Sequence, residues 1–246
     1  MSRKPGVVTA FVKEVDASQG RVSVRYEDID ETLHSSWAYV ASPMAGKNRG
    51  ALFMPEAGDE VLLAFGDNDF DYPYVIGFLW NGKQPSPDKK ANNRVIVTPG
   101  GHELRFEDVE KSNPAAGGRV IVKSKGGHSV TLEDKFPGKL EIKSGQHKIL
   151  LDDVPGAGKV SIQAGGVVTV DLMTTPPGVV IKSGGNTVTI GVAGIGVTAA
   201  GPMTLRAPIV SINSPFVSVS GYVLCQGLIT QSVVSPLYTP GLGNLI

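Results

Sequence analysis

The sequence is poor in cysteine and contains no long hydrophobic run. Cys225 is the single cysteine among 246 residues, which excludes an intrachain disulfide and leaves the redox compartment undefined. No run of 18 apolar residues occurs, and the opening residues MSRKPGVV lack a hydrophobic signal core. We therefore expect no signal peptide and synthesis in the cytoplasm. If the protein leaves the cell, it is expected to do so by a route other than general secretion.

Aromatic and charged residues are also scarce. Aromatic residues make up 7% and charged residues 19% of the chain, and 23 basic side chains balance 23 acidic ones. A zero balance argues against a protein made to bind nucleic acid. Residues 191–246 carry one charged side chain, Arg206. A solvated tail of this length normally carries more charge, so disorder is the alternative and burial against other copies of the chain is the favoured interpretation.

A repeat occupies most of the C-terminal two-thirds of the chain. Each copy has an alternating apolar and polar strand, a Gly-rich turn and a second alternating strand, and from the second copy onward the period is near 20 residues. A regular array of short strands predicts an elongated β-solenoid or β-prism rather than a compact core. The copies begin at Arg94, Arg119, Lys139, Lys159 and Gly178.

Apolar and polar residues alternate within the repeat, residues 94–190. This alternation predicts a sheet with one buried and one solvated face. Val120/Val122 and Leu140/Ile142 are examples of the apolar positions. One strand layer cannot bury this face on itself, but three chains around an axis can, and intertwining also covers the sheet edges. Residues 191–246 are predicted to continue as a narrow apolar β-helix tip segment. The solvated face is expected to carry Lys123, Glu133, Glu141, Lys143 and Lys182.

Residues 1–82 are predicted to form a small β-barrel of the five-stranded OB type. Met44–Gly50 is the best helical candidate, and it is short and contains glycine. Residues 83–93 have the composition of a linker. The fold class is therefore all-β, a barrel followed by an intertwined trimeric β-helix or β-prism. The expected barrel strands are Gly6–Val15, Gly20–Tyr26, Ser36–Val40, Glu60–Phe65 and Tyr74–Trp80.

Gly20–Gly82 resembles the OB-fold domain of contractile-injection spike proteins, a family that includes phage baseplate assembly protein V and the VgrG proteins. The resemblance is carried by GRVSVRY, by the strand SSWAYV, by MPEAGDEVLLAF and by the acidic segment Gly66–Gly77. It implies a homotrimer whose barrels form a collar facing a hub protein. The β-prism would form the spike that pierces the target membrane.

The chain departs from this family's pattern at both ends. No histidine lies beyond His147, so the iron-binding HxH element of several phage members is absent, and SPLYTPGLGNLI stands at the end instead. The resemblance then implies a spike capped by a separate PAAR-type tip protein. The large hub domain that precedes the barrel in VgrG proteins is missing from this sequence, which implies a separate hub subunit. The residues expected to contact the tip protein are Tyr238, Pro240, Leu242, Leu245 and Ile246.

Three repeat histidines follow equivalent turns: His102, His128 and His147. As metal ligands within one chain they would have to converge on one centre, whereas successive repeats separate them along an axis. In a trimer each could form a three-histidine ring, and whether such a ring binds an ion stays open. A hydrogen bond that closes the turn is the favoured interpretation. We expect no metal site and no cofactor.

The acidic segment after Gly66 resembles the start of a calcium-binding loop. An EF-hand needs glycine at its sixth position and glutamate at its twelfth, where this chain has Tyr72 and Phe78. Calcium binding is therefore rejected. No nucleophile elbow, phosphate loop or CxxC pair occurs, so we expect no catalytic residues.

The leading hypothesis is a non-enzymatic structural protein, the central spike of a contractile injection machine. The alternative is a β-helical, tail-associated enzyme that degrades polysaccharide, although the lack of charge after Gly191 opposes it. A nucleic-acid-binding barrel is a third hypothesis, opposed by the acidic turns. Phage tail, type VI secretion and extracellular particle all remain open, as do the target cell and cargo. The aromatics available to the third hypothesis are Tyr26, Trp37, Tyr39, Tyr72 and Trp80.

Overall fold

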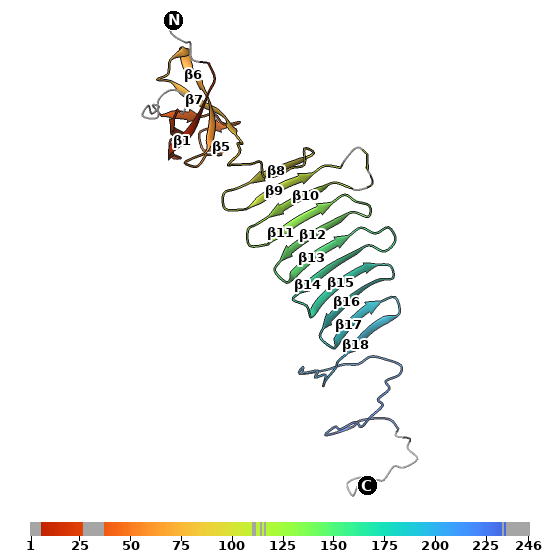
Figure 1. The fold of residues 1–246 in the computed structure, drawn as a ribbon. Helices are drawn as coiled ribbons and strands as arrows, with labels where there is room; N and C mark the ends of the chain where they lie inside the picture. The colour runs from red at the N-terminus through yellow and green to blue at the C-terminus, as the bar shows by residue number, and fades with distance from the viewer. Residues whose placement is uncertain are drawn as a thin grey trace. The chain divides into compact units, whose positions relative to one another are not determined.

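The computed structural model describes residues 6–26, 37–109, 112–113, 115, 117–232 and 234, with the side chain of Asn68 left aside. Within these ranges the regular structure consists of β-strands and one 3₁₀ turn, η1 (Gly66–Asn68). A barrel, with a two-stranded hairpin inserted between its third and fourth strands in sequence, is followed along the chain by a large sheet (Figure 1). The predicted all-β class is confirmed.

The barrel closes in the order β1-β2-β3-β7-β6 because β1 pairs with both β2 and β6. All its pairs are antiparallel except β3 with β7, which run parallel. The expected five-stranded barrel, consistent with an OB-fold, is confirmed. Its strands are β1 (Val8–Asp16), β2 (Arg21–Arg25), β3 (Ala38–Val40), β6 (Glu60–Phe65) and β7 (Pro73–Leu79).

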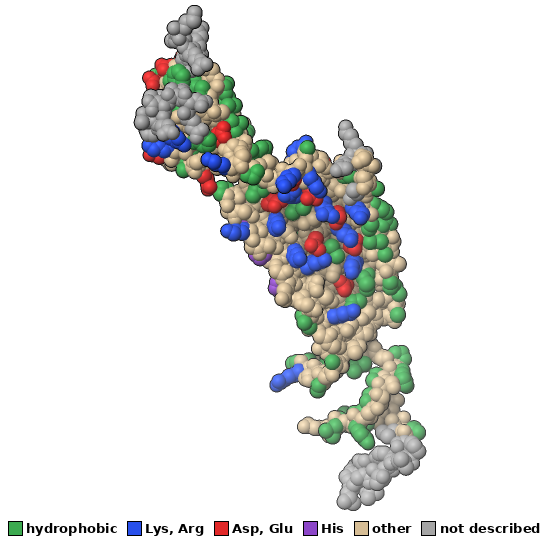
Figure 2. All heavy atoms as spheres, in the orientation of Figure 1, with side chains coloured by type: hydrophobic (Ala, Val, Ile, Leu, Met, Phe, Trp, Pro, Cys, Tyr) green, Lys and Arg blue, Asp and Glu red, His purple; other side chains and the backbone are tan. Residues whose placement is uncertain are grey.

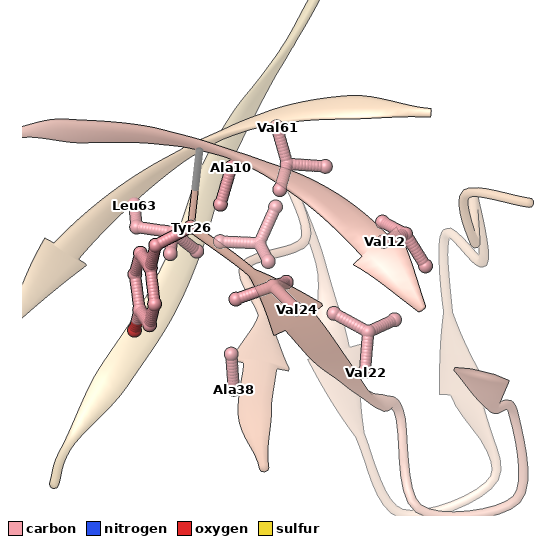
Figure 3. Close-up of a cluster of buried hydrophobic side chains, with 9 residues drawn as sticks. Ala10, Val12, Val22, Val24, Tyr26, Ala38, Val61 and Leu63 are labelled. Atoms are coloured by element: carbon pink, nitrogen blue, oxygen red, sulfur yellow. The ribbon is translucent and has the colours of Figure 1, made fainter. Parts of the chain in front are cut away.

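Small aliphatic side chains fill the barrel interior (Figure 3). They alternate along each strand, as in Val22 and Val24 or Val61 and Leu63, which is the period of a half-buried strand. Tyr26 supplies the one aromatic ring of this core, and burial raises the pKa of its phenol. Among the described residues, every buried residue lies in the barrel region.

Met44–Gly50, the best helical candidate of the sequence, is not helical. This segment forms a hairpin of β4 (Ala45–Gly46) and β5 (Arg49–Gly50), with Asn48 at φ 57° in the turn. The hydroxyl oxygen of Ser42 lies 2.5 Å from the carbonyl oxygen of Ala51 and 3.0 Å from that of Met44, so its single hydrogen links the two ends of the hairpin. Asparagine tolerates the left-handed conformation that such a turn needs, so turn chemistry outweighs the weak helical pattern.

The repeat forms one antiparallel sheet in which β8 to β18 lie in sequence order (Figure 1). Each of the five sequence repeats corresponds to one hairpin, beginning with β8–β9 and ending with β16–β17. The strands are β8 (Asn93–Val97), β9 (Glu103–Glu107), β10 (Arg119–Lys123), β11 (Ser129–Glu133), β12 (Lys139–Ser144), β13 (His147–Asp152), β14 (Lys159–Ala164), β15 (Val168–Thr174), β16 (Pro177–Ser183), β17 (Asn186–Gly191) and β18 (Gly194–Thr198).

Within one chain this sheet is a single layer, because every strand pairs only with its neighbours in sequence. It is a meander and does not wind into a solenoid. Its connections also shorten along the chain: β9 and β10 are joined by residues 108–118, whereas β15 and β16 are joined by residues 175–176. The predicted prism requires further chains.

The segment before the sheet is attached at both of its ends. The amide of Asn81 donates to Glu60 Oε2 (2.8 Å), and Gln84 Nε2 donates to Asp59 Oδ1 (3.2 Å). Further along, Asp88 is held by side chains of the sheet. Within the predicted linker, residues 83–93, residues 85–87 lie between the two attached parts.

Residues 199–232 follow the sheet as a separate unit. None of them belongs to a strand, and all are exposed. Bends occur at positions 200, 201, 208, 215, 220, 221, 226 and 231. The described tail therefore has no regular structure of its own within one chain.

Candidate functional surface: the apolar face of the repeat sheet

Two continuous columns of apolar side chains cover one face of the sheet. The strand register places directly paired residues on the same face, so Val122 lies beside Leu104 and Val130, and Ile162 lies beside Ile149 and Val170. One column is Ile96, Leu104, Val122, Val130, Ile142, Ile149, Ile162, Val170, Ile181, Val188 and Val197. The other column is Phe106, Val120, Leu132, Leu140, Leu151, Val160, Leu172, Val179, Ile190 and Ile195.

This apolar face is uncovered in a single chain. Ile162 and Leu172 each remain 44% exposed and Val122 50% exposed, although they lie in the interior of the sheet. Contiguous apolar patches of more than a few hundred Å² are rare on soluble monomers and mark interaction sites. The face is therefore the candidate functional surface of the repeat.

The opposite face carries most of the charge of the sheet. Figure 2 shows Lys, Arg, Asp and Glu side chains mixed over β8 to β16 on the side that faces the viewer. Arg119 pairs with Glu133 (3.1 Å) and Lys148 with Glu141 (2.7 Å). Exposed pairs of this kind contribute little stability, but they keep the face solvated. The two faces thus differ in the environment they require.

A denser ionic cluster joins the segment before the sheet to β9. Arg105 forms ion pairs with Asp88 and Glu103. The side-chain amide of Asn93, the backbone N–H of Lys90 and the Arg105 guanidinium all donate to Asp88 and lower the pKa of its carboxyl. Hydrogen bonds to Glu103, which has the larger effect, and to Asp88 raise the pKa of Arg105. This cluster covers the start of the sheet with polar groups.

The repeat histidines make local contacts. The carbonyls of His102 and His128 accept hydrogen bonds from Thr98 and Ser124, both at 2.9 Å, and so close their turns. The Nδ1 atom of His128 lies 2.8 Å from Ser144 Oγ, and that of His147 accepts from the Gly165 N–H at 3.3 Å. In the described part of the chain no three His, Cys, Asp or Glu side chains cluster as metal ligands would.

The remaining predicted residues divide between core, surface and undescribed regions. Trp37 packs against the Arg21 guanidinium, 4.8 Å from the ring centroid. Tyr39, Tyr72 and Trp80 are exposed, with Trp80 at 72%. None of the described residues forms a helix with the length and hydrophobicity of a membrane span. The expected tip-contact residues lie outside the described residues: Tyr238, Pro240, Leu242, Leu245 and Ile246.

The sequence interpretation named Trp80 but not the exposed apolar side chains that lie with it. Leu52 and Phe53 follow the β4–β5 hairpin and are 72% and 56% exposed. They line one hollow with Phe78 of β7, Trp80 and the first strand of the sheet, β8. Leu52 and Phe53 could have been noticed as hydrophobic residues outside the predicted strands.

Comparison with known proteins connects the barrel to a family. The family model described as "Type VI secretion system/phage-baseplate injector OB domain" matches residues 4–80. Over 102 residues the chain is 34% identical to the type VI secretion system spike protein VgrG4b of Pseudomonas aeruginosa, which covers 36% of this chain and 13% of that protein. It is 35% identical over 104 residues to VgrG1a of the same organism, with 36% and 16% covered.

Residues 4–80 are therefore similar to the injector OB domain of type VI secretion systems and phage baseplates. The resemblance to the VgrG-like central spike family is confirmed. A third relative, the spike protein VgrG1c, matches at 23% identity over 125 residues, which is 47% of this chain and 17% of that protein. The alignments thus span less than a fifth of the length of these curated relatives, all of which are named as spike proteins.

Proposed function

We propose that this protein is the central spike of a contractile injection machine and acts as a homotrimer that pierces the target envelope. The observation that carries this proposal is the uncovered apolar face of the eleven-stranded sheet. The injector OB domain and the similarity to spike proteins support the same role. The role is structural, with no reaction catalysed.

In the proposed trimer, three repeat sheets form a β-prism. Each sheet turns its two apolar columns towards the threefold axis and its charged face towards solvent. An obligate interface of this kind resembles a domain core divided among chains. The arrangement explains why the sheet is ordered yet contains no buried residue in one chain.

The tail after Thr198 is proposed to intertwine with its two sister chains. Its described residues, 199–232, contain repeated bends and form no strand within one chain. Backbone N–H and C=O groups that are withdrawn from water need partners. Strands from the other chains would supply these partners and produce a narrower β-helix towards the tip.

The proposed partners follow from this arrangement. A baseplate hub protein would bind the barrel end, and a PAAR-type tip protein would bind the C-terminal end. The spike would contact the target membrane only transiently and would not bind nucleic acid. We place its synthesis in the cytoplasm and its final position in a virion or other injection particle.

Sedimentation tests the oligomeric state of the proposed spike. We expect the purified full chain to sediment with three times the 25.8 kDa mass of one chain and with an elongated frictional ratio. Sedimentation equilibrium gives the mass without assuming a shape. A compact monomer would contradict the proposed function.

A truncation tests the tip contact separately. Removal of residues 222–246 is expected to leave the trimer intact, because the apolar face of the sheet remains, and to abolish binding of a PAAR-type protein. Pull-down with the purified tip protein measures the binding, and sedimentation of the same sample is the control. If the truncated chain still binds the PAAR-type protein, residues 222–246 do not form the contact with the tip protein.

A further inference from the structure

Histidine and aspartate side chains mark the two margins of the repeat sheet. Each of the first three sequence repeats has a histidine at the start of its second strand and an aspartate immediately after the end of that strand. Figure 2 shows histidine side chains along one margin, which we call the histidine margin, and the opposite one is the aspartate margin. The residues are His102 and Asp108 of β9 and its flanks, His128 and Asp134 of β11 and its flanks, and His147 and Asp153 of β13 and its flanks.

These side chains belong to the apolar face of the sheet. Ser124 N–H donates to the His128 carbonyl at 2.9 Å, and Asp134 N–H donates to the Gly118 carbonyl at 2.9 Å, so backbone pairing extends beyond both ends of β11. The alternation of side chains extends with the pairing. His128 lies four residues before Leu132 of the apolar column and Asp134 two residues after it, so both share its face. The same spacing places the other two pairs around Phe106 and Leu151.

The histidines offer the Nε2 atom of their rings to a partner. His147 Nδ1 accepts a hydrogen bond from Gly165 N–H at 3.3 Å, so in the neutral ring Nε2 carries the proton and is a donor. His128 Nδ1 lies 2.8 Å from Ser144 Oγ and is likewise occupied. Within the described residues, Nε2 of neither ring has a hydrogen-bond partner.

The aspartates offer the matching acceptors. Asp108, Asp134 and Asp153 are exposed, and in the part of the chain that the structure describes no side chain donates to their carboxylates. In one chain water solvates them. In the proposed trimer they would lie at the end of the apolar columns, where a carboxylate needs a donor.

The two margins do not meet within one chain, but a threefold axis brings them together. A histidine and the aspartate of the same strand are six residues apart, so about 20 Å of extended backbone separates them. Rotation places the histidine margin of one sheet beside the aspartate margin of the next sheet, because equivalent margins do not face each other in a cyclic trimer. Both residues belong to the same strand, so they meet at the same height where strands run across the axis. The margins meet at the corners of the prism, away from its axis, so the histidines of three chains do not converge on one ion.

The fourth and fifth repeats lack both residues together. The positions that correspond to the histidine and the aspartate hold Val168 and Thr174 in the fourth repeat, and Asn186 and Val192 in the fifth. A repeat with the aspartate alone would place a charge beside the apolar columns without its partner, which is costly once the columns are covered. Joint presence and joint absence are what positions that pair with each other predict.

We propose that histidines of one chain pair with aspartates of the next chain and form a polar seam along each corner of the prism, an inference that rests on the proposed trimer. Nε2 of each histidine donates to the carboxylate of the aspartate that follows the same strand in the neighbouring chain. The apolar columns are alike in every repeat and do not set the height of one sheet against the next. Polar pairs at a few positions of an apolar interface specify its register, and the seam confines them to the first three repeats.

Cross-linking through introduced cysteines tests whether the two margins meet. In the full chain, Cys225→Ser removes the single native thiol, and His128→Cys with Asp134→Cys adds one thiol at each margin. A short bis-maleimide reagent does not span the sheet within one chain, so we expect covalent dimers and trimers on denaturing gels. The control carries Thr131→Cys in place of Asp134→Cys, in the middle of β11 on the charged face, and should give single chains on the same gel. Sedimentation of the untreated samples reports the oligomeric state.

Charge reversal tests whether the paired side chains attract each other. Aspartate in place of the three histidines sets like charges opposite each other at three heights of every corner. We expect the concentration at which the trimer dissociates to rise at least about tenfold, and lysine in place of the three aspartates to restore it in the same chain. The first variant carries His102→Asp, His128→Asp and His147→Asp, and the second adds Asp108→Lys, Asp134→Lys and Asp153→Lys.

The outcomes separate the seam from the proposed function. A trimer that yields no cross-links through the two margins overturns the seam and leaves the proposed spike standing. Dissociation that is the same in the parent and in the first reversal variant does so too. A parent chain with Cys225→Ser alone that sediments as a monomer overturns both the seam and the spike.

Discussion

Ile162→Asp is expected to convert the proposed trimer into monomers and nonspecific aggregates. Ile162 lies between Ile149 and Val170 in the middle of an apolar column, so each assembled spike would bury three carboxylates near its axis. Leaving a charge buried without a partner costs about 3 to 5 kcal/mol, and the trimer contains three. Sedimentation velocity at several concentrations measures the loss.

Gln163→Asp is the matched control for this variant. Gln163 is the next residue of β14 and points to the charged face, where it pairs with Lys148 and Thr169. The same substitution there should leave the trimer intact. If Ile162→Asp also sediments as the parent trimer, the apolar columns do not form the interface.

The second large effect is expected in amide hydrogen exchange of the tail. Residues 199–232 form no strand within one chain, so in an isolated chain their amides would exchange at nearly the rate of an unfolded peptide. Pairing with sister chains should slow this exchange by a factor of about 10⁴ or more, because opening then requires separation of the strands. Exchange followed by mass spectrometry on peptic fragments measures the difference.

The interior strands β14 to β16 provide the internal standard for this experiment. Their amides have ladder partners in the same chain, so they should be protected whether or not the tail is paired. Rapid exchange confined to the tail, in a sample that sediments as a trimer, would contradict the proposed intertwining of the tail. It would not contradict the proposed β-prism of the three sheets.

The sequence predicted the elements whose pattern is local. Strand β6 was expected at Glu60–Phe65 and is found there, because alternation and the flanking turn residues both mark its ends. The five repeats became five hairpins for the same reason. Register then placed the apolar positions on one face, since hairpin turns leave no freedom for a slip.

Other features could not be read from local pattern. The hairpin at Met44–Gly50 depends on Ser42 and on the turn conformation of Asn48, which a search for helical periodicity does not detect. The attachments of Gln84 and Asp88 are hydrogen bonds between residues apart in sequence, so the composition of the predicted linker could not reveal them. The exposed group of Leu52, Phe53, Phe78 and Trp80 likewise becomes visible only when β3 and β7 lie side by side.

The difference in length between the connections has a consequence for the shape of the proposed trimer. Eleven residues, 108–118, separate β9 from β10, whereas two, 175–176, separate β15 from β16. In the proposed trimer, short connections would leave fewer side chains outside the strands in the C-terminal part of the sheet, so the cross-section would taper in that direction.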